Sequence, residues 1–261
     1  MSARLERFFV HSRFSGLVLI ALLLVAWQLS ALYVLDTPTW PPVTRILAAW
    51  YENTADGTLP GHLLATLWRQ MLGYGLAAVL GIGLGLVMGY FRPVYNLFEP
   101  LVEVLRPIPG PAYLPVLVLF VGIGHEMKVV LILVASFFPI LLNTYSGVRS
   151  IDRVQFDTAR TLGLTTLQTF RELVIPAASP QILTGMRISL AISLILAILA
   201  EMIVSSDGLG YFTLLAQRTF KIPDMYAGIF TLALFGYVLN RIFLLCEARL
   251  IRWHVESTGR Q

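Results

Sequence analysis

Long apolar runs without a single charged residue divide this chain. Residues 14–35 form one such run and residues 70–91 another, and each holds 22 residues. A helix rises 1.5 Å per residue, so about 20 apolar residues cross the hydrocarbon core of a bilayer. Lipid offers the backbone no hydrogen-bond partner, so segments of this length cross as helices, which satisfy their own backbone groups. The runs therefore predict an all-α membrane protein.

The composition supports this class. The chain of 261 residues is 57% hydrophobic and only 13% charged, with a mean hydropathy of +0.75, whereas soluble domains average about 25% charged residues. We expect one transmembrane domain over residues 14–250, a short cytoplasmic segment 1–13 before it and a cytoplasmic tail 251–261 after it. The net charge of +4 needs no nucleic-acid partner, and the single cysteine cannot form an internal disulfide.

Six spans are predicted, with residues 36–61 between the first two taken as a loop. The spans cover 14–35, 70–91, 100–122, 129–148, about 182–204 and about 225–246. A secretory signal peptide is the alternative for the first, but its apolar core would be shorter, at about 7–15 residues. Four prolines between 107 and 115 rule out a regular helix at the start of the third span. Irregular backbone at membrane depth persists only against protein or a water-filled cavity.

The basic residues of the loops predict the orientation. Short cytoplasmic loops carry an excess of Lys and Arg. Twelve arginines lie in the N-terminal segment, the 92–99 loop, residues 149–187 and the tail, against four basic residues in the loops of the opposite side. Both termini and the polar 149–180 loop are therefore expected in the cytoplasm.

The 149–180 loop carries local helix signals. Gly163 stands where a left-handed C-cap would end a first helix. Thr165 and Gln168 have the spacing of a capping box that starts a second helix, and Pro176 is expected to stop it. Ser179 and Pro180 then supply the N-cap and first turn of the next span.

This layout resembles the cytoplasmic coupling loop of ABC importer permeases. The family pattern is Glu-Ala-Ala, three residues, Gly, nine residues, an aliphatic residue, any residue, another aliphatic residue and Pro. The residues in register are Asp157, Thr158, Ala159, Gly163, Leu173, Ile175 and Pro176. Two of them depart from the pattern, Asp for Glu and Thr for the first Ala. An ordinary amphipathic loop between two spans is the alternative interpretation.

The wider resemblance covers about residues 60–250 and is to the aliphatic sulfonate, taurine and nitrate branch of these permeases. It is carried by Arg106-Pro107-Ile108-Pro109, Leu114-Pro115, Gly122-Ile123-Gly124, Lys128, Pro180, Ile182, Gly185, Arg187-Ile188, Ala200-Glu201 and Gly208-Leu209-Gly210. The resemblance implies the MetI-like fold of type I importers, with six transmembrane helices and cytoplasmic coupling helices. The same branch also serves bicarbonate, riboflavin and pyrimidine precursors of thiamine.

The resemblance also implies partners. It predicts a second copy of the chain, an ABC ATPase dimer on the cytoplasmic face of a bacterial inner membrane and an extracytoplasmic solute-binding protein. ATP and Mg would be bound by the ATPase, because this chain has no G-x-x-x-x-G-K-[ST] motif; no cofactor is expected here, and no enzymatic activity. The expected function is import of a small anionic solute. A neutral or heterocyclic solute, a secondary transporter acting alone and a heterodimer remain open alternatives.

Three charged residues are candidates for the translocation pathway: Arg106, Glu103 and Glu201. Charges within spans usually face a bundle interior or an aqueous path. Arg106 would attract an anion there, or instead pair with Glu103 or Glu99 one helical turn away. Glu201 would pair with a cation of the assembled dimer, line the outer gate or lie at the membrane interface.

The remaining patterns predict packing and exclude catalysis. Gly81, Gly85 and Gly89 repeat at four-residue spacing, which lets another helix approach closely. The four histidines are far apart in sequence and no two have a metal-ligand spacing. No G-x-S-x-G motif occurs. We therefore expect neither a catalytic site nor a metal site.

Overall fold

Membrane-length helices make up most of the computed structural model, which describes residues 13–35 and 37–251. Among these residues there is no β-strand. The elements are α2 (Arg13–Tyr33), α3 (Val43–Ala55), α4 (Thr58–Tyr90), α5 (Arg92–Leu105), η1 (Gly110–Tyr113), α6 (Leu114–Val121), α7 (His125–Arg149), α8 (Arg153–Thr161), α9 (Thr166–Thr169), η2 (Phe170–Val174), α10 (Ile175–Ile203), α11 (Leu209–Arg218) and α12 (Ile222–Leu250).

Five helical stretches of the described chain are long and apolar enough to cross a membrane, and a sixth span forms if the bent pair α5 and η1–α6 is counted as one. The predicted all-α, multi-span class is confirmed. Most of the predicted cytoplasmic segment 1–13 and of the tail 251–261 lies outside the described residues.

The predicted loop 36–61 is only partly a loop. Residues 43–55 form α3, and α4 begins at Thr58, twelve residues before the predicted start of the second span. The prediction used the uncharged run alone, so the predicted span began only after the charged residue Arg69. The structure continues the helix through Arg69, because this side chain is fully buried and paired within the protein.

The third span breaks where its prolines predict. Helix α5 ends at Leu105, and the following segment Gly110–Val121 is bent by 92° from it. Pro107 and Pro109 have no backbone N–H to continue the helical ladder. The chain turns through residues 106–109 and resumes as the 3₁₀ helix η1 and then α6.

The described residues form two compact units, one made of those up to 61 with 212–231 and the other of 62–211 with those from 232 to 251. The first unit is held by aromatic side chains. Trp27 stacks on Trp40 with ring centroids 4.8 Å apart and meets the edge of Tyr226. The Trp50 indole N–H donates to Thr231 Oγ1 over 3.1 Å.

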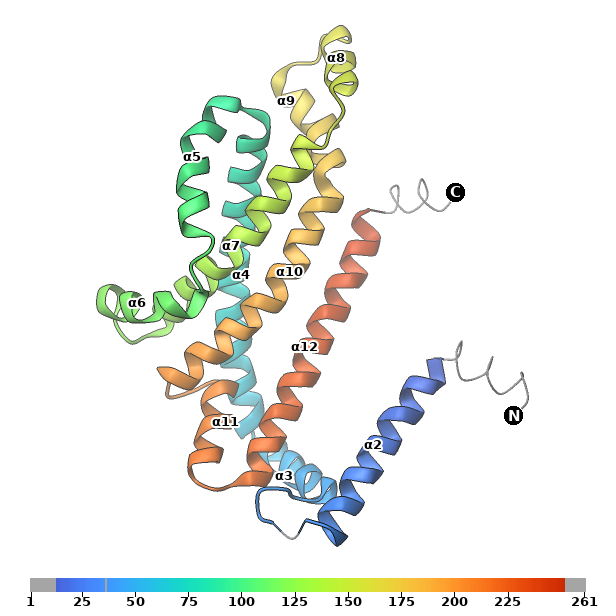
Figure 1. Cartoon of the computed structure of the whole chain (residues 1–261), viewed down its shortest axis with the longest axis vertical. Coiled ribbons are helices and arrows are strands. Elements are labelled where there is room, and N and C mark those ends of the chain that lie inside the picture. The colour runs from blue at the N-terminus through green and yellow to red at the C-terminus, as the bar shows by residue number, and fades with distance from the viewer. Residues whose placement is uncertain (1–12, 36, 252–261) are drawn as a thin grey trace, which may run out of the picture. The chain divides into compact units, whose positions relative to one another are not determined.

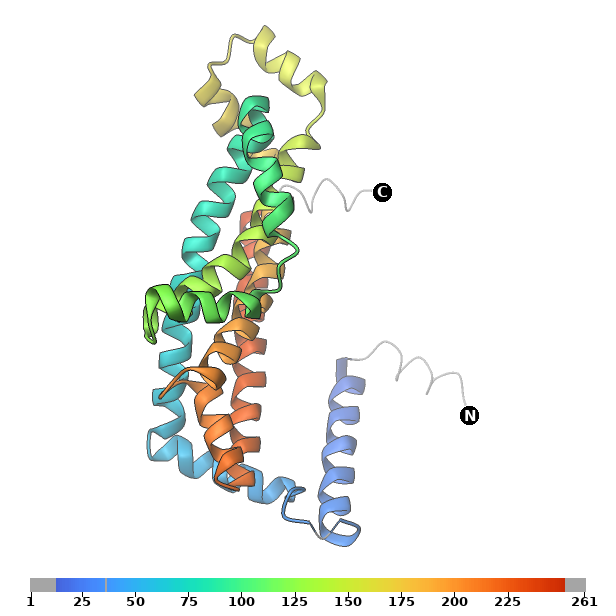
Figure 2. The same cartoon turned by 60° about the vertical axis from the view of Figure 1, so that its left-hand side comes forward.

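The second unit is built on three helices that run side by side, α4, α7 and α10 (Figures 1 and 2). Helix α7 packs against both of the others. It supplies Met127, Leu131, Ile132, Ile140 and Leu141, all fully buried, to the core. Ser189 of α10 donates to the backbone carbonyl of Ser136 in α7 over 2.7 Å. These contacts bring the two ends of the 149–180 loop together.

The glycine stripe of α4 faces α7. A Cβ atom added to Gly85 would lie 2.7 Å from Thr144 Cβ and 2.9 Å from the Leu141 carbonyl oxygen, and one added to Gly89 would lie 2.5 Å from Val148 Cβ. Atoms do not approach this closely, so any larger residue would push α4 away from α7. The partner of the stripe is therefore a helix of the same chain.

Replacing Gly85 by Leu should destabilise the second unit, because overpacking a close contact costs about 1–3 kcal/mol. Thermal unfolding of the detergent-solubilised protein measures the loss as a lower midpoint and a lower yield of folded protein. Gly83→Leu is the matched control, since a Cβ at Gly83 meets nothing within 4 Å. Equal midpoints for the two variants would contradict this packing.

Candidate functional site

The polar loop between α7 and α10 starts with a well-capped helix. Asp152 precedes α8, and its carboxylate accepts a hydrogen bond from the backbone N–H of Val154 over 3.0 Å. The helix ends at Thr161, and Gly163 follows it with a φ of +70°, the left-handed conformation that the sequence predicts. The N–H groups of Gly163 and Leu164 donate back to the carbonyls of Arg160 and Ala159, which completes a Schellman motif.

The second helix of the loop starts with the predicted capping box. Thr165 Oγ1 accepts from the Gln168 backbone N–H, and the Gln168 side chain accepts from the Thr165 backbone N–H over 2.8 Å. The helix has only four residues before the winding changes to a π-helix over residues 170–174. The two caps together hold the sharp turn between α8 and α9.

The predicted helix stop at Pro176 is wrong. The helical path runs from Thr166 to Ile203, and Pro176 lies in the first turn of α10 directly after the π-helix. The wider π turn accommodates a residue that lacks a backbone N–H. The predicted N-cap at Ser179 and Pro180 is wrong as well. Both lie inside α10, where the Ser179 hydroxyl donates over 2.8 Å to the Pro176 carbonyl that Pro180 leaves unpaired.

Apolar contacts fix the loop to the ends of α7 and α10. Val148, Val174 and Ala178 are buried together, and partly buried side chains of the loop, Ile151 and Phe156 among them, pack on this cluster. Ala159 of α8 is buried as well, with 5% of its surface exposed. These contacts therefore join α8 to both helices.

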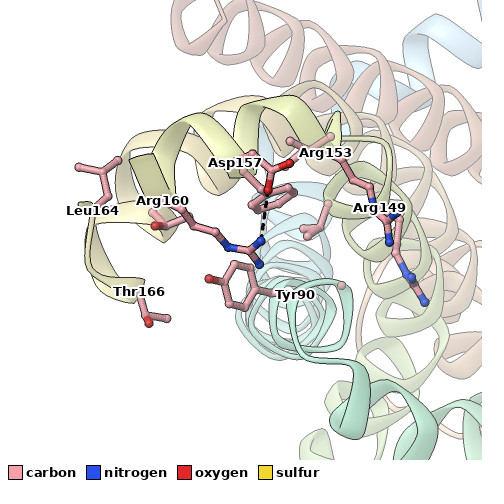
Figure 3. A pocket seen from close by; sticks show the side chains of 12 residues that line it. Tyr90, Arg149, Arg153, Asp157, Arg160, Leu164 and Thr166 are labelled. Atoms are coloured by element: carbon pink, nitrogen blue, oxygen red, sulfur yellow. Dashed lines mark hydrogen bonds and ion pairs between the residues drawn. The ribbon is translucent and has the colours of Figure 1, made fainter. Parts of the chain in front are cut away.

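An open groove with basic residues borders the same cluster, between the loop and the end of α4. This groove of about 680 Å³ is lined by Arg149, Arg153, Arg160 and Tyr90, together with Asp157 (Figure 3). Asp157 and Arg160 pair over 3.2 Å, but both side chains are more than two thirds exposed, so this pair adds little stability. The groove thus presents more positive than negative charge to the surrounding solution.

Large apolar side chains also point outward from the loop. Val154, Leu162 and Leu167 are 67%, 72% and 79% exposed. They alternate with the arginines on a segment held rigidly by two caps. An apolar and basic surface of this kind is suited to docking another protein, since apolar side chains and arginine are the groups that carry binding energy in interfaces.

The motif residues divide between the buried and the exposed side of the loop. Asp157 and Thr158 are exposed on α8, and the Thr158 hydroxyl donates to the Val154 carbonyl over 2.8 Å. Ala159 is buried and Gly163 forms the turn. In the helical path to α10, Leu173 and Pro176 are half-buried and Ile175 is 45% exposed. Some side chains at the motif positions thus pack inside the loop, and others form part of its exposed surface.

Arg106 lies at a second recess. Its guanidinium is 3.0 Å from Glu103, one turn earlier, and both side chains are almost half exposed. A recess of about 530 Å³ is lined by Arg106 and Tyr113 together with Asn143 of α7 and Leu196 of α10. Arg106 is therefore both paired and accessible, which agrees with each of the two predicted roles.

Glu201 is in a different environment. It is 1% exposed and accepts from Arg69 over 2.8 Å, from the Thr66 hydroxyl over 3.0 and 2.9 Å, and from the Gly210 backbone N–H over 3.1 Å. Arg69 is fully buried and also pairs with Asp207. Glu201 thus belongs to a closed ionic network inside the unit, and its cation comes from the same chain.

Two members of this network were missed in the sequence, Thr66 and Arg69. With Gln70, they have the i, i+3 and i+4 spacing that places polar side chains on one helical face, which is the signal that would have found them. Burial opposes the charge of Asp207, but the hydrogen bonds and positive charge of Arg69 outweigh it and lower the pKa of Asp207. Ionised Asp207 therefore stabilises the folded unit at pH values above the ordinary carboxyl pKa. This stabilisation is lost as the pH falls through the lowered pKa of Asp207.

Comparison with known proteins gives a consistent result. The profile of the family described as binding-protein-dependent transport system inner membrane component matches residues 77–252. A putative aliphatic sulfonates transport permease protein, SsuC of Bacillus subtilis, is 32% identical over 94% of this chain and 89% of its own length. The taurine transport system permease protein TauC of Escherichia coli is 33% identical over 91% and 88%.

Further similarity extends to nitrate permeases and to solved structures. The nitrate import permease protein NrtB of a Synechocystis species is 30% identical over 90% of this chain and 88% of its own. Among solved structures, an inward-facing form of the MetNI methionine ABC transporter matches 74% of this chain and 94% of its own chain with a TM-score of 0.62 at 19% identity. The fold is thus that of ABC importer permeases.

Removing the buried cation at Arg69 should lower the stability of the second unit more than the substitution of an exposed residue does. Arg69→Met would leave the carboxylate of Glu201 buried without a counter-charge, which costs about 3–5 kcal/mol. Chemical unfolding in detergent measures this. The matched control is Arg160→Met, which breaks an exposed pair and should leave the unfolding midpoint unchanged. Similar midpoints for both variants would show that the buried pair does not stabilise the unit.

Proposed function

The chain belongs to the family of binding-protein-dependent transport system inner membrane components, and we propose that it imports a small organic anion together with an ATPase that binds its 149–180 loop. The carrying observation is the rigid, outward-facing loop with its family motif in register and its exposed apolar and basic side chains. ATP and Mg would be bound by the partner, and this chain would perform no hydrolysis itself.

The proposed assembly has two copies of this chain and two ATPase subunits in a bacterial inner membrane. Both termini and the 149–180 loop lie in the cytoplasm, as the distribution of arginines predicts. A solute-binding protein delivers the substrate on the opposite side. When the ATPase subunits close on ATP, α8 moves with them, and α7 and α10 follow because Val148, Val174 and Phe156 link them to the loop.

An anionic substrate is favoured by two observations. The relatives described above are named for aliphatic sulfonates, taurine and nitrate, which all carry an anionic group. Arg106 supplies an accessible cation in the bent third span. A neutral or heterocyclic solute is the alternative, and a secondary transporter acting alone is a weaker one, because it has no use for a docking loop on the cytoplasmic side.

The Gly163→Val variant tests coupling. A β-branched residue at a φ of +70° costs about 1–2 kcal/mol, so the turn between α8 and α9 should distort while the spans stay folded. We expect copurification with the ATPase to weaken and ATP-driven uptake to fall relative to ATP hydrolysis in proteoliposomes.

The control for this experiment is Gly57→Val, which has the same kind of backbone, a φ of +85° with open space around it, but lies between α3 and α4. It should leave uptake per ATP unchanged. Normal uptake by Gly163→Val would refute the coupling role, and the absence of any copurifying ATPase from the unmodified protein would favour a transporter acting alone.

Arg106→Gln tests the pathway. If Arg106 attracts the anion, uptake should fall about tenfold or more, as expected when a charge-assisted contact is lost, while ATPase activity stimulated by the binding protein persists. Arg45→Gln removes an exposed arginine elsewhere and serves as the control. Loss of both activities with poor assembly would assign Arg106 a structural pairing with Glu103. An unchanged uptake rate would remove it from the pathway.

A further inference from the structure

Another polar recess, distinct from the one at Arg106, lies at the ends of α7 and α10 that are remote from the 149–180 loop. It has a volume of about 530 Å³ and is lined by the start of α7 and by residues 203–207 after α10. Its polar lining consists of His125, Lys128, Ser205, Ser206 and Asp207. Neither the 149–180 loop nor Arg106 contributes to this recess, so the function proposed above assigns it no role.

Lys128 is the unusual member of this lining. Only 4% of the residue is exposed, and within the described chain its ammonium has one recorded hydrogen-bond acceptor, Ser205 Oγ at 2.7 Å. An ammonium carries three N–H donors. A buried lysine with donors to spare is costly unless another acceptor completes its shell, and the recess beside it offers room for one.

Two further donors line the same recess. The Nδ1 atom of His125 accepts a hydrogen bond from Arg69 Nε over 2.9 Å. A neutral imidazole that accepts at one nitrogen carries its proton on the other, so His125 presents an Nε2–H donor, and the residue is exposed. Ser206 is exposed too and adds a hydroxyl. Three donors match the three oxygens of a sulfonate.

The recess also contains a negative charge. Asp207 lines it with its side chain 40% exposed, although the carboxylate pairs with Arg69. The two cations Arg69 and Lys128 balance the two carboxylates Glu201 and Asp207. A simple anion would leave an unbalanced charge in this partly buried site, whereas a zwitterion adds none.

From this arrangement we propose that the recess binds a small zwitterion, an aminoalkanesulfonate, with the sulfonate on Lys128, His125 and Ser206 and the ammonium toward Asp207. The inference rests on the proposed function and modifies its substrate class: the anionic group is kept, and an ammonium on the same solute balances its charge. In the proposed orientation the recess faces the side from which the binding protein delivers.

The test uses calorimetric titration of the purified permease–ATPase complex without its binding protein. The probes are 2-aminoethanesulfonate, its deamino analogue ethanesulfonate and the carboxylate β-alanine. We expect saturable binding of the first probe, and binding at least about tenfold weaker for each of the others, since each lacks one charge-assisted contact or one oxygen. Equal affinities for 2-aminoethanesulfonate and ethanesulfonate would overturn the zwitterion assignment.

Variants assign the site. Lys128→Met should weaken binding of 2-aminoethanesulfonate about tenfold or more, while Lys128→Arg should retain most of it. Lys221→Met, at an exposed lysine elsewhere, should bind like the unmodified complex. Asp207→Asn should reduce the preference for 2-aminoethanesulfonate over ethanesulfonate. Unchanged affinity in Lys128→Met would overturn the proposal.

Substitutions at the exposed Ser206 test the same site even if the Lys128 variants misfold. Ser206→Asp places a negative charge at an exposed position beside the sulfonate and should weaken binding, whereas Ser206→Asn should weaken it less. Equal affinities for these two variants would overturn the proposal.

ATP-driven uptake by the same complex tests the proposed function separately. If uptake occurs but these variants do not change binding, only the proposed recess is rejected. If binding is intact but uptake is absent, only the importer function is rejected.

Discussion

The buried ion pair between Arg69 and Glu201 is the interaction on which the second unit depends. Two opposite charges with no exposed surface tie α4 to α10 over 2.8 Å, at a place where neither lipid nor water compensates them. The same network includes backbone N–H groups of residues 209 and 210, so it also fixes the chain as it leaves α10 for α11. The recess around Lys128 lies beside this turn and shares Asp207 with the network.

At the opposite ends of the same helices, the stabilisation is apolar and local. Caps at Asp152, Gly163 and Thr165 shape the 149–180 loop from within, and the cluster around Val148 and Val174 joins it to the spans. The exposed surface of the loop contributes little to its own stability, so its apolar and basic side chains are available for the proposed contact with an ATPase. Rigid attachment and an open surface are the two properties that a coupling element needs.

Much of this architecture was predictable, because the bilayer imposes a strong constraint on sequence. The uncharged runs, the proline break in the third span, the turn at Gly163 and the capping box at Thr165 all follow from local rules, and the structure agrees with each. The errors lie where a local rule was overridden. Pro176 did not end its helix, since a π turn makes room for it, and Arg69 did not mark a span boundary, since its counter-charges lie more than 130 residues away.

The sequence by itself determined the class, the approximate positions of the spans and the caps within the 149–180 loop, because hydrophobic length, backbone restrictions at Gly and Pro, and capping act over a few neighbouring residues. Only the tertiary structure decided the partners of the charges and glycines. The α4 stripe lies on α7, Glu201 pairs with Arg69, and Lys128 joins Asp207 at one recess. These pairings depend on how distant helices meet, and the energy of a buried charge is set by what surrounds it in space.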